Sequence, residues 1–266
     1  MVADTGKRSA IVTGGSRGIG ESVVRRLAGD GYQVAFCAND QRGVASLERE
    51  LQAAGMSATG WTIDVKDVTA VQRFVNEAGE AHGGLDAVVG CAGIQRYGSV
   101  EGTTLETWRE VIDTNLTSMF ALSAAAVPLL RRRGGGSIVA VASVQAMATQ
   151  REVAAYTASK GGLVALIRAI AVDYAAENIR ANSVLPGSVD TPMLRWAADK
   201  FAGDRGDAEA LIGQWGSSHP MGRVAKADEV AAAVAFLCGP DASFITGAEV
   251  KVDGGLLASL PVALPQ

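Results

Sequence analysis

The segment that decides the fold is Ser9-Ala10-Ile11-Val12-Thr13-Gly14-Gly15-Ser16-Arg17-Gly18-Ile19-Gly20, an apolar run that leads directly into a glycine-rich turn. The apolar run predicts a strand, and the residues after it predict a helix. Gly14 permits the tight turn, Gly18 removes a side chain where backbone must approach a pyrophosphate, and Gly20 lets helix and strand pack closely. The N-terminus of that helix offers free N–H groups to phosphates. The segment therefore predicts a dinucleotide-binding site.

The same turn also contains Gly14-x-Ser16-x-Gly18, which is the nucleophile-elbow pattern of α/β-hydrolases. A hydrolase of that fold carries the elbow after a central strand, followed by an acid and then a histidine. Here the motif lies at the start of the chain, and the two histidines are His82 and His219. An acyl-transfer enzyme with Ser16 as nucleophile remains the alternative.

Further along, β-branched runs alternate with helical patterns through the whole chain. Strands are predicted over 9–13, 33–38, 58–63, 87–90, 137–142, 180–185 and 249–252, and helices over 18–30, 44–54, 68–81, 105–132, 154–177 and 227–238. Strands joined by crossover helices form parallel sheets that are covered on both faces. No linker, repeat or low-complexity tract interrupts the pattern, so residues 1–266 are predicted to form a single α/β domain of about seven parallel strands.

One segment, residues 189–224, departs from this alternation and is called the lid segment below. It contains two prolines and two tryptophans, Trp196 and Trp215. Long insertions in α/β proteins often cover the ligand, which lies beyond the carboxyl ends of the strands. We expect it to cover the substrate; the alternative is a surface excursion that its tryptophans pack down.

Composition and charge exclude several classes of function. The 24 basic and 28 acidic residues give a net charge of −4, which disfavours nucleic-acid binding. Cys37, Cys91 and Cys238 have neither metal-type spacing nor an even number, so we predict no metal site and no disulfide framework. The polar N-terminus and the lack of a run of about 18 apolar residues predict a cytoplasmic protein without a membrane partner.

The end of the second predicted strand indicates which cofactor is preferred. An acid about 20 residues past the glycines would bind the ribose of NAD, but Ala38 and Asn39 occupy these positions and Asp40 lies just beyond. Arg17 in the turn offers charge to a 2′-phosphate. NADP(H) is therefore favoured, with NAD(H) as the alternative. At the end of the third strand, Asp64 is predicted either to bind the adenine amino group or to cap the following helix.

Candidate catalytic residues follow the fifth strand. Tyr156 and Lys160 are four residues apart and therefore lie on one face of a helix, one turn apart. An adjacent ammonium favours the phenolate, and this cation together with the nicotinium charge is expected to lower the pKa of Tyr156 toward working pH. Ser143 ends the fifth strand, where its hydroxyl can hold a substrate oxygen. Such a set favours proton transfer to and from a ketone or alcohol oxygen.

The order Thr-Gly-x-x-x-Gly-x-Gly, Ser143 and Tyr156-x-x-x-Lys160 resembles the short-chain dehydrogenase/reductases over nearly the whole chain. The resemblance implies a Rossmann-type doubly wound sheet and an NAD(P)-dependent alcohol dehydrogenase or carbonyl reductase. It also implies that Asn115 completes a catalytic tetrad by supporting a water linked to the lysine, and that the enzyme is a homotetramer. The tetramer would form through the two long helices and the C-terminal strand.

The resemblance further implies that Pro186-Gly187 lies beside the nicotinamide and that Thr191 contacts its carboxamide. One departure is Gly90-Cys91-Ala92-Gly93, where the family has Asn-Asn-Ala-Gly; Cys91 then replaces an asparagine that braces the sheet. Cys91 is not expected to be a nucleophile, since no basic residue adjoins it in sequence. The predicted cofactor-binding residues are Gly14, Ser16, Arg17, Gly18, Ile19, Gly20, Ala38, Asn39, Asp64, Val65, Cys91, Ala92, Gly93, Tyr156, Lys160, Pro186, Gly187, Val189 and Thr191.

The predicted substrate residues mix amides with apolar groups, a pattern that suits sugars, polyols or 3-oxoacyl chains. They are Gln95, Val144, Gln145, Met193, Leu194 and Trp196. A third functional alternative is a regulator that senses NADP(H) without catalysis; a complete catalytic set argues against it.

Overall fold

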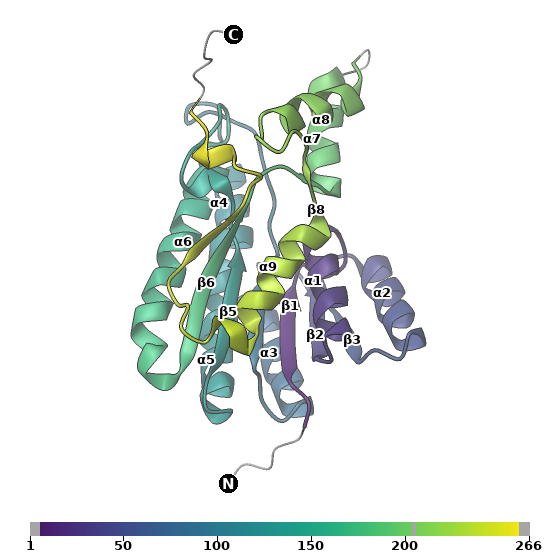
Figure 1. The fold of residues 1–266 in the computed structure, drawn as a ribbon, viewed down its shortest axis with the longest axis vertical. Helices are drawn as coiled ribbons and strands as arrows, with labels where there is room; N and C mark the ends of the chain where they lie inside the picture. The colour runs from purple at the N-terminus through teal and green to yellow at the C-terminus, as the bar shows by residue number, and fades with distance from the viewer. Residues whose placement is uncertain (1–5, 204–205, 261–266) are drawn as a thin grey trace.

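The computed structural model describes residues 6–203 and 206–260 and shows a central parallel sheet between two layers of helices (Figure 1). The sheet has seven strands in the order β3-β2-β1-β4-β5-β6-β9, and every neighbouring pair is parallel. The strands are β1 (Ser9–Thr13), β2 (Gln33–Ala38), β3 (Ala58–Thr62), β4 (Ala87–Gly90), β5 (Gly136–Val141), β6 (Ile179–Pro186) and β9 (Glu249–Val252). The predicted doubly wound Rossmann-type fold is confirmed.

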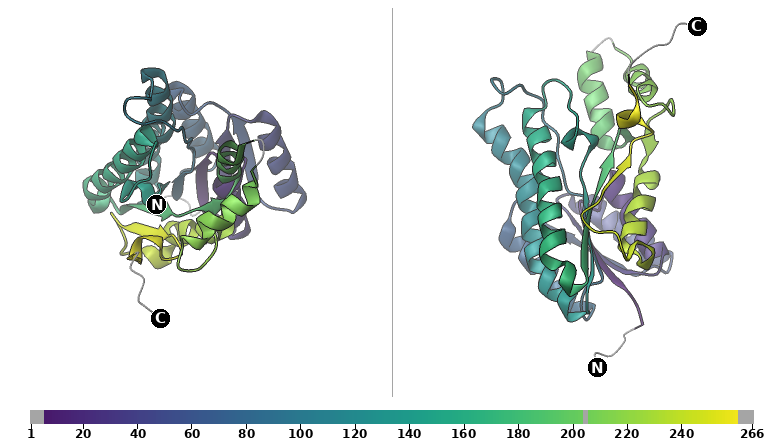
Figure 2. Two further views of the ribbon diagram at one scale, coloured as in Figure 1. Left: turned by 90° about the horizontal axis from the view of Figure 1, so that it is seen from above. Right: turned by 60° about the vertical axis from the view of Figure 1, so that its left-hand side comes forward.

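The helices cover the sheet because each presents an apolar face to it. They are α1 (Gly18–Gly29), α2 (Gln41–Ala53), α3 (Val68–Ala81), α4 (Leu105–Ile112), α5 (Ser118–Arg132), α6 (Ala154–Tyr174) and α9 (Ala227–Cys238). Side chains of α3, α5 and α6 form one core with the sheet, around Leu122 and Ile138. Those of α1, α2 and α9 form the other core, around Phe36 and Val89. The two layers lie on opposite sides of the sheet in Figure 2.

The predicted helix over 105–132 is interrupted. A π-helical turn, Asp113–Thr117, separates α4 from α5 and carries Asn115. Such turns are local insertions into a helix and occur frequently at functional sites. The hydrophobic period continues through the turn, so the sequence pattern alone showed one helix. The other elements begin and end within three residues of the predicted positions.

The lid segment forms two helices, α7 (Pro192–Ala202) and α8 (Ala208–Ser217), which stand beyond the carboxyl ends of the strands (Figure 1). Thr191 caps α7 by accepting a hydrogen bond from the N–H of Leu194, and Pro192 occupies the first turn, where its missing N–H costs nothing. At the base of the segment, β7 (Val189–Asp190) pairs with β8 (Ala225–Lys226) in a parallel ladder that the sequence did not predict. The lid segment is thus tied at both ends.

One stretch, Ala154–Glu177, is long and apolar enough to cross a bilayer by length and composition alone. It consists of α6 and the short turn after it. Half of its most apolar window is buried inside the fold, and the helix packs against β6. This burial is typical of a helix in the core of a globular domain.

Candidate functional site

The glycine-rich turn lies where β1 and β4 run side by side, with Thr13 opposite Gly90. The sheet order reverses direction at this point, which is where doubly wound sheets bind ligands. Gly14 has φ +68°, and a Cβ on it would lie 2.7 Å from the amide nitrogen of Ala92. A Cβ on Gly20 would lie 2.0 Å from the carbonyl oxygen of Gly14. Both positions therefore require glycine, as a backbone cradle for a pyrophosphate does.

The base of the lid segment closes against this turn. A Cβ on Gly18 would lie 3.3 Å from the Cγ2 methyl of Thr191, so the two backbones approach each other closely. Residues far apart in sequence thus meet: the turn after β1, the Cys91-Ala92-Gly93 segment after β4, and the first residue before α7. The predicted cofactor residues of these three segments are therefore brought together. The glycines among them lack side chains, which leaves the backbone open to the approach of a dinucleotide.

The Ser143, Tyr156 and Lys160 side chains are all buried at the carboxyl end of β5. The hydroxyl of Ser143 is close enough to the phenol of Tyr156 to lower its pKa. Lys160 is 4% exposed; its Nζ donates to the carbonyl oxygen of Val141 at 2.8 Å and lies 5.6 Å from the centre of the Tyr156 ring. The helical spacing therefore places the ammonium beside the phenol, and the strand end supplies the serine, as the sequence predicted.

The pKa of Tyr156 differs from the expectation. Burial raises it to about 12, although Ser143 acts in the opposite direction. Burial also lowers the pKa of Lys160 to about 8. Desolvation disfavours the charged form of each group, the phenolate of Tyr156 and the ammonium of Lys160, because water is excluded from both. In the chain without cofactor, the Tyr156 phenol is therefore protonated at neutral pH, and the lowering of its pKa by Lys160 together with the nicotinium charge stays a prediction.

Asn115 is 1% exposed and fixes the segment that follows β4. Its Oδ1 accepts from the N–H of Ile94 at 2.8 Å, and its Nδ2 donates to the carbonyl oxygen of Ile94 at 2.9 Å and to Ser159 Oγ at 2.9 Å. Ser159 Oγ in turn donates to the carbonyl oxygen of Tyr156 at 2.7 Å. The amide therefore links the helix of Tyr156 to the loop beneath the lid segment.

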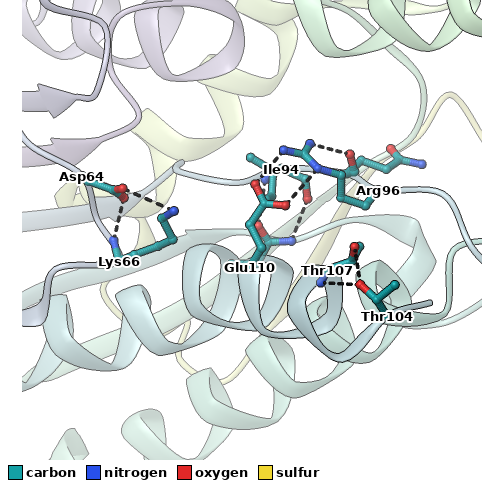
Figure 3. Close-up of polar contacts among 9 residues, drawn as sticks. Asp64, Lys66, Ile94, Arg96, Thr104, Thr107 and Glu110 are labelled. Carbon is teal, nitrogen blue, oxygen red and sulfur yellow. Dashed lines mark hydrogen bonds and ion pairs between the residues drawn. The ribbon is translucent and has the colours of Figure 1, made fainter.

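A bidentate ion pair between Arg96 and Glu110 holds the next residues of this loop against α4 (Figure 3). Arg96 Nε and Nη2 donate to the two carboxylate oxygens of Glu110 at 3.1 and 2.7 Å, and Nη1 donates to the carbonyl oxygen of Gln95 at 3.1 Å. At the start of α4, the hydroxyl of the N-cap residue Thr104 accepts a hydrogen bond from the N–H of Thr107. The loop is thus anchored on both sides of Gln95.

Tyr97 is a site residue that the sequence reading missed. Its ring stacks on Trp196 of α7 at 6.0 Å between centroids and meets Phe201 edge to face at 4.6 Å. A charge on Tyr97 would also raise the pKa of Tyr156, so the two phenols are near each other. Its position in the sequence could have indicated this role, because Tyr97 lies two residues after Gln95, which is predicted to face the substrate.

Among the predicted substrate residues, Gln145 offers an unpaired acceptor that a ligand could bind. Its buried Oε1 has no hydrogen-bond partner among the residues that the structure describes. The backbone N–H of Gln145 donates to Ser143 Oγ at 3.1 Å, so the two residues are in direct contact. Val144 is buried beside it, while Met193 and Trp196 are exposed on α7. The structure therefore places Val144 and Gln145 directly after Ser143, whereas Met193 and Trp196 lie on α7.

The acidic residues at the ends of β2 and β3 are engaged in local contacts. Asp40 caps α2 by accepting from the N–H of Arg42 at 3.2 Å, so its carboxylate faces the helix. Asp67, not Asp64, caps α3, which makes the capping alternative for Asp64 wrong. Asp64 instead accepts from the N–H of Lys66 at 3.0 Å and pairs with its ammonium at 3.4 Å, as Figure 3 shows.

Cys91 packs against the glycine turn, and a Cβ on Gly20 would lie 3.3 Å from the Cys91 Cβ. Burial raises the pKa of the Cys91 thiol to about 12, although Lys160 acts in the opposite direction. The thiol is therefore protonated at neutral pH, and a nucleophilic role is disfavoured.

The geometry gives Ser16 no histidine base. The ring nitrogens of His219 face the backbone N–H of Ser188 and the carbonyl oxygen of Trp215. His82 follows α3 and precedes β4, so it lies near the amino-terminal ends of the strands, whereas the glycine turn lies at their carboxyl ends. His219 is therefore engaged with backbone groups, and His82 lies at the other end of the strands. Neither arrangement supports a hydrolase with Ser16 as nucleophile.

Comparison with known proteins gives the same picture for residues 14–257, which match the family model described as enoyl-(acyl carrier protein) reductase. The rabbit (Oryctolagus cuniculus) dehydrogenase/reductase SDR family member 4 is 36% identical over 247 residues, 92% of each chain. A putative ketoacyl reductase of Streptomyces coelicolor is 34% identical over 250 residues, covering 93% of this chain and 96% of the relative.

Solved structures agree over the same length. Ligand-free aldohexose dehydrogenase of Thermoplasma acidophilum superposes with a TM-score of 0.90 at 35% identity, covering 98% of both chains. A variant of actinorhodin polyketide ketoreductase with NADPH superposes with a TM-score of 0.90 at 33% identity, covering 94% of this chain and 97% of the other.

Proposed function

Because this chain belongs to the short-chain dehydrogenase/reductase family of oxidoreductases, we propose that it interconverts a ketone and a secondary alcohol with NADP(H). The observation that carries the proposal is the set of three side chains buried together at the end of β5, Ser143, Tyr156 and Lys160, with the Lys160 ammonium 5.6 Å from the centre of the Tyr156 ring. The glycine cradle at Gly14 and Gly20 supports the nicotinamide dinucleotide as partner.

The four residues divide the chemistry at the substrate oxygen. Ser143 donates a hydrogen bond that holds and polarises this oxygen, and Tyr156 delivers the proton to it during reduction. Lys160 anchors the cofactor ribose and keeps positive charge near the phenol, while Asn115 holds the loop and the Tyr156 helix in register. When bound, the nicotinamide ring supplies or accepts the hydride. With its pKa raised to about 12, the Tyr156 phenol is protonated at neutral pH and can donate this proton to a ketone oxygen.

The preference for NADP(H) over NAD(H) rests on charge at the adenine side. Ala38 and Asn39 present no carboxylate, and the Asp40 carboxylate faces the N–H of Arg42 at the start of α2. Arg17 is exposed at the N-terminus of α1, where it can pair with a 2′-phosphate. The absence of a repelling acid and the presence of this arginine together favour the phosphorylated cofactor.

For the substrate, the apolar wall of Tyr97, Met193 and Trp196 favours a ketone with an extended carbon body, and a 3-oxoacyl compound is the first candidate. A sugar or polyol is the second, since the free Oε1 of Gln145 can accept a hydrogen bond from a further hydroxyl. The two classes differ in whether that amide contributes to recognition.

A panel of ketones and alcohols, assayed with both cofactors by absorbance at about 340 nm, tests the proposal. We expect ketone-dependent oxidation of NADPH that Tyr156→Phe abolishes, and weaker activity with NADH. Comparable efficiency with NADH would overturn the cofactor preference. Cofactor binding without turnover on any member would favour the regulator, and esterase activity lost in Ser16→Ala would favour the hydrolase.

We also propose that the enzyme is a homotetramer of the cytoplasm. Phe120 of α5 and Val172 of α6 are 59% and 80% exposed, and large apolar side chains on two adjacent long helices favour contact with a second copy. A tetrameric mass by light scattering is expected; a monomeric mass would contradict it. Fractionation of the native cells tests the compartment.

A further inference from the structure

His219 lies at the junction of the lid segment, the turn after β6 and the C-terminal turn, and it is only 3% exposed. Its Nε2 accepts a hydrogen bond from the N–H of Ser188 at 3.1 Å, and its Nδ1 faces the carbonyl oxygen of Trp215 at 2.9 Å. An N–H group can only donate and a carbonyl oxygen can only accept. The network therefore requires a neutral ring that carries its proton on Nδ1.

The turn that His219 holds is central to the site. A Cβ on Gly187 would lie 2.6 Å from His219 Nε2, so the ring packs directly on this backbone. Ser188 connects two hydrogen bonds: its N–H donates to His219, and its carbonyl oxygen accepts from the N–H of Ala225 at 2.8 Å. One imidazole thus joins the end of α8 to the hinge from which α7 begins.

We propose that His219 is a positioning residue and that protonation of its ring loosens both the lid segment and the turn at Gly187. This inference rests on the proposed function, because it assigns the turn to the nicotinamide side. A protonated ring places an Nε2–H against the Ser188 N–H, so two donors face each other where buried groups cannot turn to water. Histidine is the side chain that changes charge between about pH 5 and 8.

The surroundings offer little to stabilise an imidazolium. The Pro186–Ser188 turn and the end of α8 from Trp215 to Ser218 contain no titratable side chain. In the C-terminal turn, the Asp253 carboxylate already accepts from the N–H groups of Gly255 and Leu257, at 3.0 and 2.9 Å.

On the histidine's own segment, Arg223 pairs with Glu229 at 2.7 Å. None of these groups provides a free carboxylate for the protonated ring.

The test measures NADP⁺ binding by calorimetry from about pH 7.5 to about pH 5.5. His219→Gln retains an acceptor for the Ser188 N–H but does not titrate. His82→Gln is the matched control, because the chain has two histidines and His82 lies outside the site. In wild type and His82→Gln, we expect Kd to rise about tenfold more on acidification than in His219→Gln; titration of the 2′-phosphate affects all three alike.

An equal acid-side rise in His219→Gln would overturn the proposal. Hydrogen exchange of the peptide containing Ser188 separates this failure from failure of the proposed function, because it needs no cofactor. After correction for intrinsic rates, the amide should lose protection at acid pH in wild type and keep it in His219→Gln. Equal protection in both proteins at both pH values would contradict the inference even if the chain binds no nucleotide.

Discussion

The glycine-rich turn and the lid segment lie on the same edge of the sheet, but they are built in different ways. The turn is one continuous stretch, and its geometry is enforced by backbone contacts at Gly14 and Gly20. The lid segment is held by side chains from distant parts of the chain, such as Tyr97 on Trp196 and His219 on Ser188. At Gly14 and Gly20 any side chain would overlap neighbouring backbone atoms, whereas side-chain contacts can change when either partner is substituted. The comparison indicates that the backbone of the glycine turn is rigidly specified, whereas the side-chain contacts of the lid segment are adjustable.

The chemistry between the two regions should be the most sensitive point. Tyr156→Phe removes the proton donor while leaving the ring, and we expect turnover to fall roughly 10²- to 10⁴-fold with little change in cofactor affinity. Steady-state kinetics and calorimetry measure the two quantities. Tyr174→Phe, at the far end of the same helix, is the control and should behave as wild type. Substantial turnover in Tyr156→Phe would remove that residue from its role.

The rigidity of the glycine turn is tested by Gly20→Ala. The added methyl would lie 2.0 Å from the Gly14 carbonyl oxygen, so backbone must move; we expect a loss of about 1–3 kcal/mol in unfolding free energy and weaker cofactor binding. Denaturant unfolding and calorimetry give both values. Gly29→Ala in the same helix has nothing within 4 Å and should stabilise the protein by roughly 0.5–1 kcal/mol. Similar results for the two variants would show that the turn is not constrained as described.

The pKa values of Lys160 and Tyr156 give the reaction a pH dependence with a defined sign. Burial lowers the pKa of Lys160 to about 8, while the pKa of Tyr156 is about 12. Below pH 8 both groups carry protons; above it the ammonium is lost first. Reductive kcat/KM should therefore be level on the acid side of this limb and fall about tenfold per pH unit above 8.

Lys160→Arg tests whether Lys160 causes the fall in activity above pH 8, because a guanidinium keeps its charge up to about pH 12. The normalised profile of the variant should stay level to a higher pH, whatever its maximum rate. An unchanged alkaline limb would assign it to another group.

The adjustable region should show a smaller and more selective effect. Tyr97→Ala removes the ring that stacks on Trp196 and meets Phe201, so we expect KM for the ketone to rise about five- to tenfold with cofactor Kd unchanged. Tyr97→Phe keeps the ring and should remain close to wild type in KM. A fall in cofactor affinity in Tyr97→Ala would show that the lid segment and the glycine turn are not separable.

The smallest effect is expected where the loop is anchored from outside. Glu110→Gln weakens the bidentate pair with Arg96, which is partly exposed, so screening limits the loss to about 1 kcal/mol. We expect KM for the ketone to rise a few-fold and kcat to hold. A change in kcat larger than that in KM would mean that the loop acts on Tyr156 rather than on the substrate. Glu106→Gln on the same helix, which makes no such pair, provides the reference.

The sequence determined the strands, most helices, and the residues whose roles depend on spacing along one element. A glycine turn between strand and helix, and a tyrosine and lysine one helical turn apart, are local patterns with local consequences, so they could be read directly. The π-helical turn at Asn115 could not, because its hydrogen-bond register changes without changing the hydrophobic period. Tyr97, His219 and the raised pKa of Tyr156 depend on which distant groups surround them. Only the tertiary structure decided these, since burial and contact are properties of the assembled fold.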